Sequence, residues 1–188
     1  MRKKVIAIGA STGGVEAIET LISRLPASVP PVVLVLHMPI GFTKLLATRL
    51  NGLYSVAVKE ARTGDLLKYG QVLLAEAGKH MITLNKDGAL TVECYAGPKV
   101  QHVIPSADVL FESVAKVSQK NAIGVILTGM GADGARGLLA MRKAGASTIG
   151  QNRETCAIYG MSKVAKEMGA VQYELPLNEI SDKILSLI

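Results

Sequence analysis

Three residues of the types that cooperate in nucleophilic catalysis each follow a predicted buried strand: Ser11, His37 and Asp133. Ser11 comes after the strand-like run Val5–Gly9 and is followed by Gly13 and Gly14, where a helical pattern begins. In such a strand-to-helix turn, backbone N–H groups lie near the serine hydroxyl. This geometry suits either an activated nucleophile or a bound phosphate.

His37 and Asp133 are expected at the same edge of the sheet as Ser11. His37 follows the run Val32–Leu36, and Asp133 lies in the glycine-rich loop after Ile123–Leu127. The carboxyl ends of parallel strands share one edge, where sites form in open sheets. A neutral histidine there could take the serine proton while the aspartate holds its other ring nitrogen. The candidate oxyanion donors and site-shaping residues are Thr12, Gly13, Met130 and Gly131.

Each of these residues also has a purely structural interpretation. Ser11 could cap the helix that follows it, and Asp133 could cap the helix that begins at Ala135. A single histidine at a strand end is more often structural than catalytic. The match of Gly9–Gly13 to G-x-S-x-G is short enough to recur by chance. The argument therefore depends on the joint placement of the three residues.

Nucleotide and metal sites fit the sequence poorly. The Ser11 turn lacks the spacing of G-x-G-x-x-G, and His37 stands where an acidic residue would hold a ribose. A G-x-x-x-x-G-K-[ST] loop is absent. The three histidines are scattered without a carboxylate cluster, and Cys94 and Cys156 form neither a disulfide framework nor a zinc motif. We therefore expect no metal.

Composition indicates a single globular domain spanning residues 1–188. The hydrophobic fraction is 49% and the charged fraction 19%, and no apolar run approaches the ~20 residues of a membrane span. The N-terminus lacks the features of a signal peptide, so we expect a cytoplasmic protein. The net charge of +6 favours an acidic partner, while seven aromatic residues (Tyr five, Phe two) argue against base-stacking surfaces for nucleic acid.

The hydrophobic pattern predicts an α/β fold with a doubly wound, mostly parallel sheet and helices on both faces. Strands are expected at Val5–Gly9, Val32–Leu36, Ile123–Leu127, Thr148–Gly150 and Val171–Tyr173. Helices are expected at Val15–Leu25, Phe42–Leu50, Ala107–Lys116 with Ser106 as its cap, Ala135–Lys143, Tyr159–Met168 and Leu177–Leu187. Asn51-Gly52 is expected to end the second helix.

The middle of the chain has a different pattern, with four short strand candidates. These are Tyr54–Val58, Val72–Ala75, Met81–Leu84 and Leu90–Cys94. The segment Asn85–Gly88 between the last two is typical of a hairpin turn, with a glycine available for positive φ. We expect this region to form an antiparallel insertion at the edge of the parallel sheet.

Several motifs in matching order resemble the catalytic domain of the chemotaxis receptor methylesterases. They are Ile6–Gly14, His37-Met38-Pro39 with Gly41-Phe42-Thr43, Pro105–Phe111, Leu127–Gly137, and Gly150–Asn152 with Tyr159–Met161. The resemblance runs from Val5 to about Val171. It implies a doubly wound parallel sheet with an antiparallel hairpin, and an enzyme that uses no cofactor.

The activity implied by this resemblance is hydrolysis of γ-glutamyl methyl esters on the cytoplasmic helices of chemoreceptors, with glutamine deamidation in many members. By motif matching, Ser11 is the nucleophile, His37 the base and Asp133 the residue that orients it. The Met130 N–H would serve the oxyanion hole, and Thr12 would help to shape the site. The protein would act without inserting into the membrane.

The chain departs from the family pattern in two respects. Members carry an N-terminal receiver domain, whereas this sequence starts at the catalytic strand, as an excised domain or a stand-alone protein would. Leu36, Ile40 and Ile104 replace a usual Gln, Pro and Arg, and we expect them near the rim of the site. Two alternatives follow: a non-catalytic domain of this fold that binds a receptor or nucleotide, and an esterase with another substrate.

Overall fold

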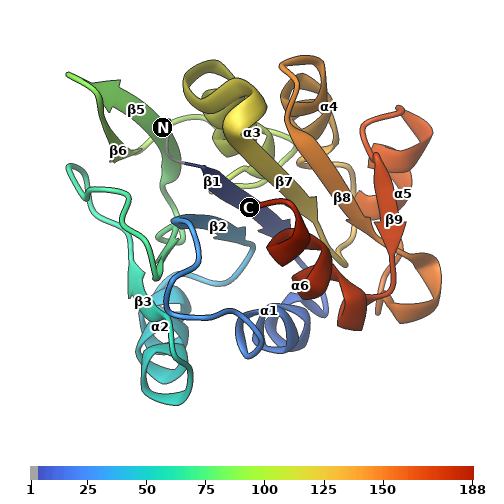
Figure 1. Ribbon diagram of the computed structural model, residues 1–188, viewed down its shortest axis with the longest axis horizontal. Helices are drawn as coiled ribbons and strands as arrows, with labels where there is room; N and C mark the ends of the chain where they lie inside the picture. Colours follow the sequence, from blue (N-terminus) through green and yellow to red (C-terminus); the bar gives the residue numbers. More distant parts are fainter. Residues whose placement is uncertain (1–3) are drawn as a thin grey trace.

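The computed structural model describes residues 4–188, which fold around a parallel sheet with helices on both faces (Figure 1). Within these residues, seven strands form the sheet in the order β3-β4-β2-β1-β7-β8-β9, and every pairing in it is parallel. The strands are β1 (Val5–Ala10), β2 (Val32–Leu36), β3 (Ala57–Glu60), β4 (Gln71–Leu74), β7 (Ala122–Ile126), β8 (Ser147–Gln151) and β9 (Tyr173–Leu175). The predicted doubly wound α/β architecture is confirmed.

Helices flank the sheet and close two hydrophobic cores. They are α1 (Gly14–Ile22), α2 (Phe42–Leu53), α3 (Ala107–Ser118), α4 (Ala135–Lys143), α5 (Met161–Glu167) and α6 (Leu177–Ser186), with short 3₁₀ turns at Gln119–Asn121 and Arg153–Thr155. Residues of β1 alternate between the cores: Ile6 and Ile8 pack with α1, α2 and α6, whereas Val5 and Ala7 pack with α3, α4 and α5. Both faces are buried, which explains why the central strands are apolar throughout. None of the helices described combines the length and apolarity that a membrane crossing requires.

The prediction of a four-stranded antiparallel insertion is wrong for its first half. Only β5 (His80–Lys86) and β6 (Ala89–Tyr95) form an antiparallel hairpin, whereas β3 and β4 are parallel strands at the edge of the main sheet. Because Val72, Leu73 and Leu74 are all buried, β4 behaves as an internal strand beside β2. The connection between β3 and β4 contains no helix. Within this connection, Leu67 N donates a hydrogen bond to Leu90 O of the β5–β6 hairpin.

Local turn chemistry was predicted correctly in two places and wrongly in one. Asp87 (φ 50°) and Gly88 (φ 86°) turn the hairpin, and Ser106 caps α3 by accepting from Val109 N. Helix α2, however, continues through Asn51 to Leu53. Asn51 does not stop the helix because its side chain accepts from Val58 N (2.9 Å), which fixes the start of the following strand instead.

The strand order reverses between β1 and β7. From β1 the chain proceeds to β2 on one side, and it later returns to β7 on the other. Loops at the carboxyl ends of β1, β2 and β7 therefore meet at a topological switch point, where open parallel sheets form their sites. Ser11, His37 and Asp133 follow these three strands.

Candidate active site

Ser11 lies in the turn between β1 and α1, and its side chain does not cap the helix. The backbone N–H of Ser11 donates to Thr128 O (3.0 Å), and Gly14 N donates to Ser11 O (2.7 Å). The N-cap of α1 is Gly13, whose φ of 77° needs a glycine, and no side chain bonds to the helix start. The structural interpretation of Ser11 as a cap is thus wrong, and its partly exposed side chain is left for another role.

His37 continues the ladder between β1 and β2 beyond the end of β2. Ala10 is in register with Leu36, and His37 N donates to Ala10 O (3.1 Å). The next residues in this register are Ser11 and His37. Ser11 and His37 thus leave the carboxyl ends of two neighbouring strands, and no hydrogen bond joins their side chains within residues 4–188.

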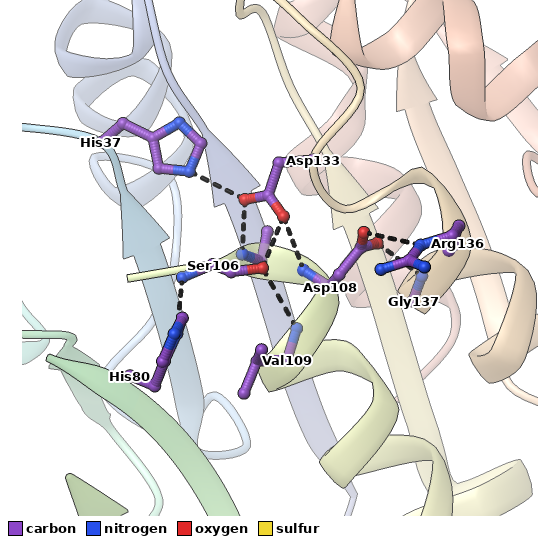
Figure 2. A network of polar contacts seen from close by, with 9 residues as sticks. His37, His80, Ser106, Asp108, Val109, Asp133, Arg136 and Gly137 are labelled. Atoms are coloured by element: carbon purple, nitrogen blue, oxygen red, sulfur yellow. Dashed lines mark hydrogen bonds and ion pairs between the residues drawn. The ribbon is translucent and has the colours of Figure 1, made fainter. Parts of the chain in front are cut away.

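Asp133 bonds to the imidazole and is itself held at the start of helix α3 (Figure 2). Its Oδ2 lies 2.8 Å from His37 Nε2. Ser106 Oγ donates to Oδ1 (2.6 Å), while the N–H groups of Ala107 (2.7 Å) and Asp108 (3.1 Å) donate to Oδ2 and Oδ1. Asp133 therefore caps α3 and not the helix that follows it in sequence, where Gly134 (φ 90°) is the N-cap.

This environment keeps the buried Asp133 ionised. Burial alone raises the pKa of a carboxyl, but hydrogen bonds from His37, Ser106 and the two N–H groups of α3 outweigh it, so the pKa of Asp133 is lowered. The positive end of the helix dipole acts in the same direction. An ionised carboxylate only accepts hydrogen bonds, so His37 Nε2 carries the proton between them. In neutral imidazole, Nδ1 is then the free acceptor.

The segment that holds Asp133 is fixed by buried polar contacts that sequence reasoning missed. Ser106 N donates to His80 Nδ1 (3.2 Å), and His80 Nε2 lies 2.8 Å from Pro98 O. Figure 2 shows His80, Ser106, Asp133 and His37 as one connected network. The motif Pro105–Phe111 was the available signal, although nothing in its spacing pointed to Asp133. His80 has a structural role in this network.

Asp108 joins the two helices on either side of this network. Its Oδ1 accepts from Gly137 N (2.7 Å) in α4, and its Oδ2 accepts from Arg136 Nε (3.2 Å). The loop that carries Asp133 thus runs between two helices whose N-terminal ends are tied together. Such fixed geometry limits the reorganisation needed when charge develops at the site.

The loop after β7 is fastened to the chain before α5. Gly129 N donates to Ile158 O (3.0 Å), and Met161 N donates to Gly129 O (2.8 Å). Thr128 Oγ1 donates to Thr12 O (3.0 Å) and so links this loop to the Ser11 turn. Sequence reasoning also missed Thr128. Within residues 4–188, the N–H groups of four residues of these turns have no acceptor: Thr12, Gly13, Met130 and Gly131.

Gly129 lies against Ser11 and leaves no room for a side chain. A Cβ at this position would be 2.7 Å from Ser11 Cβ and 2.3 Å from Met161 Sδ. Met130, by contrast, is 76% exposed. The Met130-Gly131 turn thus follows a tightly packed glycine next to the serine.

The three departures from the family pattern have different surroundings. Leu36 ends β2 at the carboxyl edge of the sheet, but it is buried and packs in the core shared by α1 and α2, so it lines no open surface. Its side chain lies against the start of α1, where a Cβ at Gly14 would be 2.6 Å from Leu36 Cδ1. Ile40 is 81% exposed, and it lines a groove with Ile104 and His37.

No metal-ligand set accompanies these residues. Among residues 4–188, no three His, Cys, Asp or Glu side chains gather in a way that could hold a metal ion. Of the remaining histidines, His102 is exposed in the loop before α3. The chemistry that the arrangement offers is proton transfer through His37 and hydrogen bonding to a developing oxyanion.

Comparison with known proteins finds one family along nearly the whole chain. Residues 6–184 match the family described as CheB methylesterase. The chain is 53% identical over 184 residues to "Protein-glutamate methylesterase/protein-glutamine glutaminase 2" of Syntrophomonas wolfei, covering 98% of this chain and 54% of that protein. A relative from Syntrophotalea carbinolica is 50% identical over 185 residues, covering 98% and 52%. The chain thus spans about half the length of these curated relatives.

The fold matches a solved structure of the same kind. The crystal structure of the Thermotoga maritima CheB methylesterase catalytic domain superimposes with a TM-score of 0.97 at 36% sequence identity, and each chain is covered completely. This agreement includes the two-stranded hairpin as well as the parallel sheet.

Proposed function

Because the chain belongs to the CheB methylesterase family, we propose that residues 1–188 form one catalytic domain that hydrolyses γ-glutamyl methyl esters of chemoreceptors. The names of the relatives also support glutamine deamidation, in which ammonia leaves instead of methanol. Both reactions yield a glutamate side chain. In this proposal Ser11 is the nucleophile, His37 the general base and Asp133 the residue that orients the imidazole.

The observation that carries this proposal is the 2.8 Å contact between His37 Nε2 and Asp133, together with the cradle that holds the carboxylate. A purely structural role for His37 does not explain why its partner Asp133 is kept ionised by a serine hydroxyl and the N-terminus of a helix. The contact fixes the tautomer with Nδ1 free. It also leaves a negative charge in place to stabilise imidazolium.

The proposed reaction proceeds in two stages. His37 Nδ1 takes the hydroxyl proton of Ser11 as Oγ attacks the ester carbonyl, and the resulting oxyanion accepts bonds from N–H groups such as that of Met130. Collapse of this intermediate breaks the bond to methoxide, which receives the proton from His37 and departs as methanol. Water then attacks the acyl-serine with the same base, which restores Ser11 and releases the glutamate.

Substitution of the nucleophile tests the proposal. Methanol release from methylated chemoreceptor membranes is measured for the wild type, Ser11→Ala and the matched control Ser23→Ala, an exposed serine at the end of α1. We expect Ser11→Ala to lose a factor of about 10³ or more, because the covalent route is gone, while the control keeps wild-type activity. Retained turnover in Ser11→Ala would refute the assignment.

Two further assays on the same protein distinguish the proposed function from its two alternatives, an esterase with another substrate and a non-catalytic binding domain. A fluorophosphonate probe labels Ser11 if the serine is activated, and the matched control shows whether labelling is specific. Hydrolysis of a small neutral ester without turnover of the receptor would favour an esterase with another substrate. Neither labelling nor turnover would favour a binding domain of the same fold.

A further inference from the structure

A groove opens beside the catalytic histidine, and its walls come from three separate segments: the chain after β2, Gly78 between β4 and β5, and the chain before α3. It has a volume of about 400 Å³ and is bounded by His37 and Ile40 after β2, and by Lys99, His102, Val103 and Ile104 before α3. His37 forms part of the wall, so a peptide seated in this groove would lie beside the reacting ester.

The groove is apolar with a cationic rim. Ile40, Val103 and Ile104 supply the apolar surface, and no residue that lines the groove carries a carboxylate. Lys99 is exposed and has no ion-pair partner among residues 4–188. Lys79, in the connection between β4 and β5, differs from Lys99 because its Nζ lies 2.7 Å from a carboxylate oxygen of Glu76. Lys99 is thus a positive charge that no neighbour in the described chain neutralises.

The backbone of this rim is held in an unusual form. Val100 and Val103 exchange two hydrogen bonds of 3.0 Å, closing a two-residue turn. Its central residues, Gln101 (φ 51°) and His102 (φ 67°), both occupy the left-handed region. Glycine or asparagine usually fills such positions because other side chains are strained there. Here the turn holds the His102 side chain at the groove, between Lys99 and Ile104 in sequence.

We propose that this groove binds the peptide segment flanking the scissile ester and selects a segment that carries a carboxylate, which Lys99 neutralises. The inference rests on the proposed function, since it assigns a substrate preference to the same site. Charge complementarity supports this occupant: the rim is cationic, the groove contains no carboxylate, and the chain has a net charge of +6. The apolar wall receives the aliphatic side chains of the same segment.

Binding of two labelled peptides tests this preference directly. Both contain one γ-methyl glutamate, flanked by glutamates in one peptide and by glutamines in the other. Fluorescence anisotropy gives the Kd of each for Ser11→Ala protein, with and without Lys99→Glu. The matched control is Lys120→Glu, which makes the same charge change at an exposed lysine. Lys120 lies before β7, at the amino ends of the strands, whereas the groove lies at their carboxyl ends.

We expect Ser11→Ala protein to bind the acidic peptide about tenfold more tightly than the neutral peptide at low salt, and Lys120→Glu to keep this ratio. Lys99→Glu should reduce the ratio to one or below, and 0.5 M NaCl should reduce it in the parent protein. Equal ratios in Lys99→Glu and Lys120→Glu would overturn the inference, as would a parent protein with no acidic preference. Methanol release from methylated chemoreceptor membranes by wild-type protein tests the proposed function separately, so that the two failures are distinguishable.

Discussion

Replacing Ser106 with alanine should destabilise the protein because its one buried hydroxyl bonds two partners. Ser106 Oγ donates to the Asp133 carboxylate at 2.6 Å and accepts from Val109 N at the start of α3. A hydrogen bond to a charged group contributes about 1.5–3 kcal/mol, and an N-cap about 1 kcal/mol. Together these give an expected loss of about 2.5–4 kcal/mol in the free energy of unfolding at pH 7.

The loss should depend on pH with a definite sign. The pKa of Asp133 is lowered in the folded protein, so this group contributes stability that is present above its unfolded pKa and is lost as pH falls through the folded value. Without the Ser106 hydroxyl the folded pKa moves back toward its ordinary value of 3.8. The difference between wild type and Ser106→Ala should therefore shrink as pH falls below about 4.

Urea unfolding followed by circular dichroism measures this difference at pH 7 and at pH 3.5. Ser186→Ala is the control, since its hydroxyl is on the exposed side of α6 and its substitution should change stability by less than about 0.5 kcal/mol. A loss in Ser106→Ala below about 1 kcal/mol at pH 7 would refute the reasoning. So would a loss of equal size at both pH values.

Three further predictions concern packing and reactivity. Gly129→Ala places a Cβ 2.7 Å from Ser11 Cβ, so ester hydrolysis should fall about 100-fold while the circular dichroism spectrum is retained; unchanged hydrolysis would contradict the packing. Leu36→Gln should cost about 2–4 kcal/mol in urea unfolding, because its side chain is buried; a changed peptide preference at full stability would instead place it at the rim. Burial raises the pKa of Cys94 to about 11, so iodoacetamide should modify it at pH 7.5 about 100-fold more slowly than free cysteine, as measured by mass spectrometry; comparable rates would show an accessible thiolate.

The parallel sheet and the three residues at its edge follow from the pattern of apolar runs along the chain. The sequences of β1, β2 and β7 do not alternate between apolar and polar residues, because both faces of these strands are buried. An uninterrupted apolar run in the sequence is enough to predict that burial. Residues that follow such strands share one edge whatever their distance in sequence. This rule predicts that Ser11, His37 and Asp133 lie together at one edge of the sheet.

Short-range signals were reliable where a single turn was involved. The Asp87-Gly88 turn and the Ser106 cap both depend on residues within a few positions of each other. Asn51 shows the limit of such signals, since its amide found a partner in Val58 seven residues away and the helix continued. A side chain that can stop a helix stops it only when no better partner is near.

The pairing of the edge strands and the helix that Asp133 caps depend on tertiary packing. Strand β4 enters the sheet beside β2 rather than joining the hairpin, because its run of three apolar residues, Val72 to Leu74, needs cover on both faces. Asp133 meets Ser106 across 27 residues of sequence, although its spacing pointed to the helix at Ala135. The spacing of residues in the sequence predicts which face of a helix or strand they lie on and where that element ends. The partner of a buried charge depends instead on tertiary packing, because packing decides which helix N-terminus lies beside the charge.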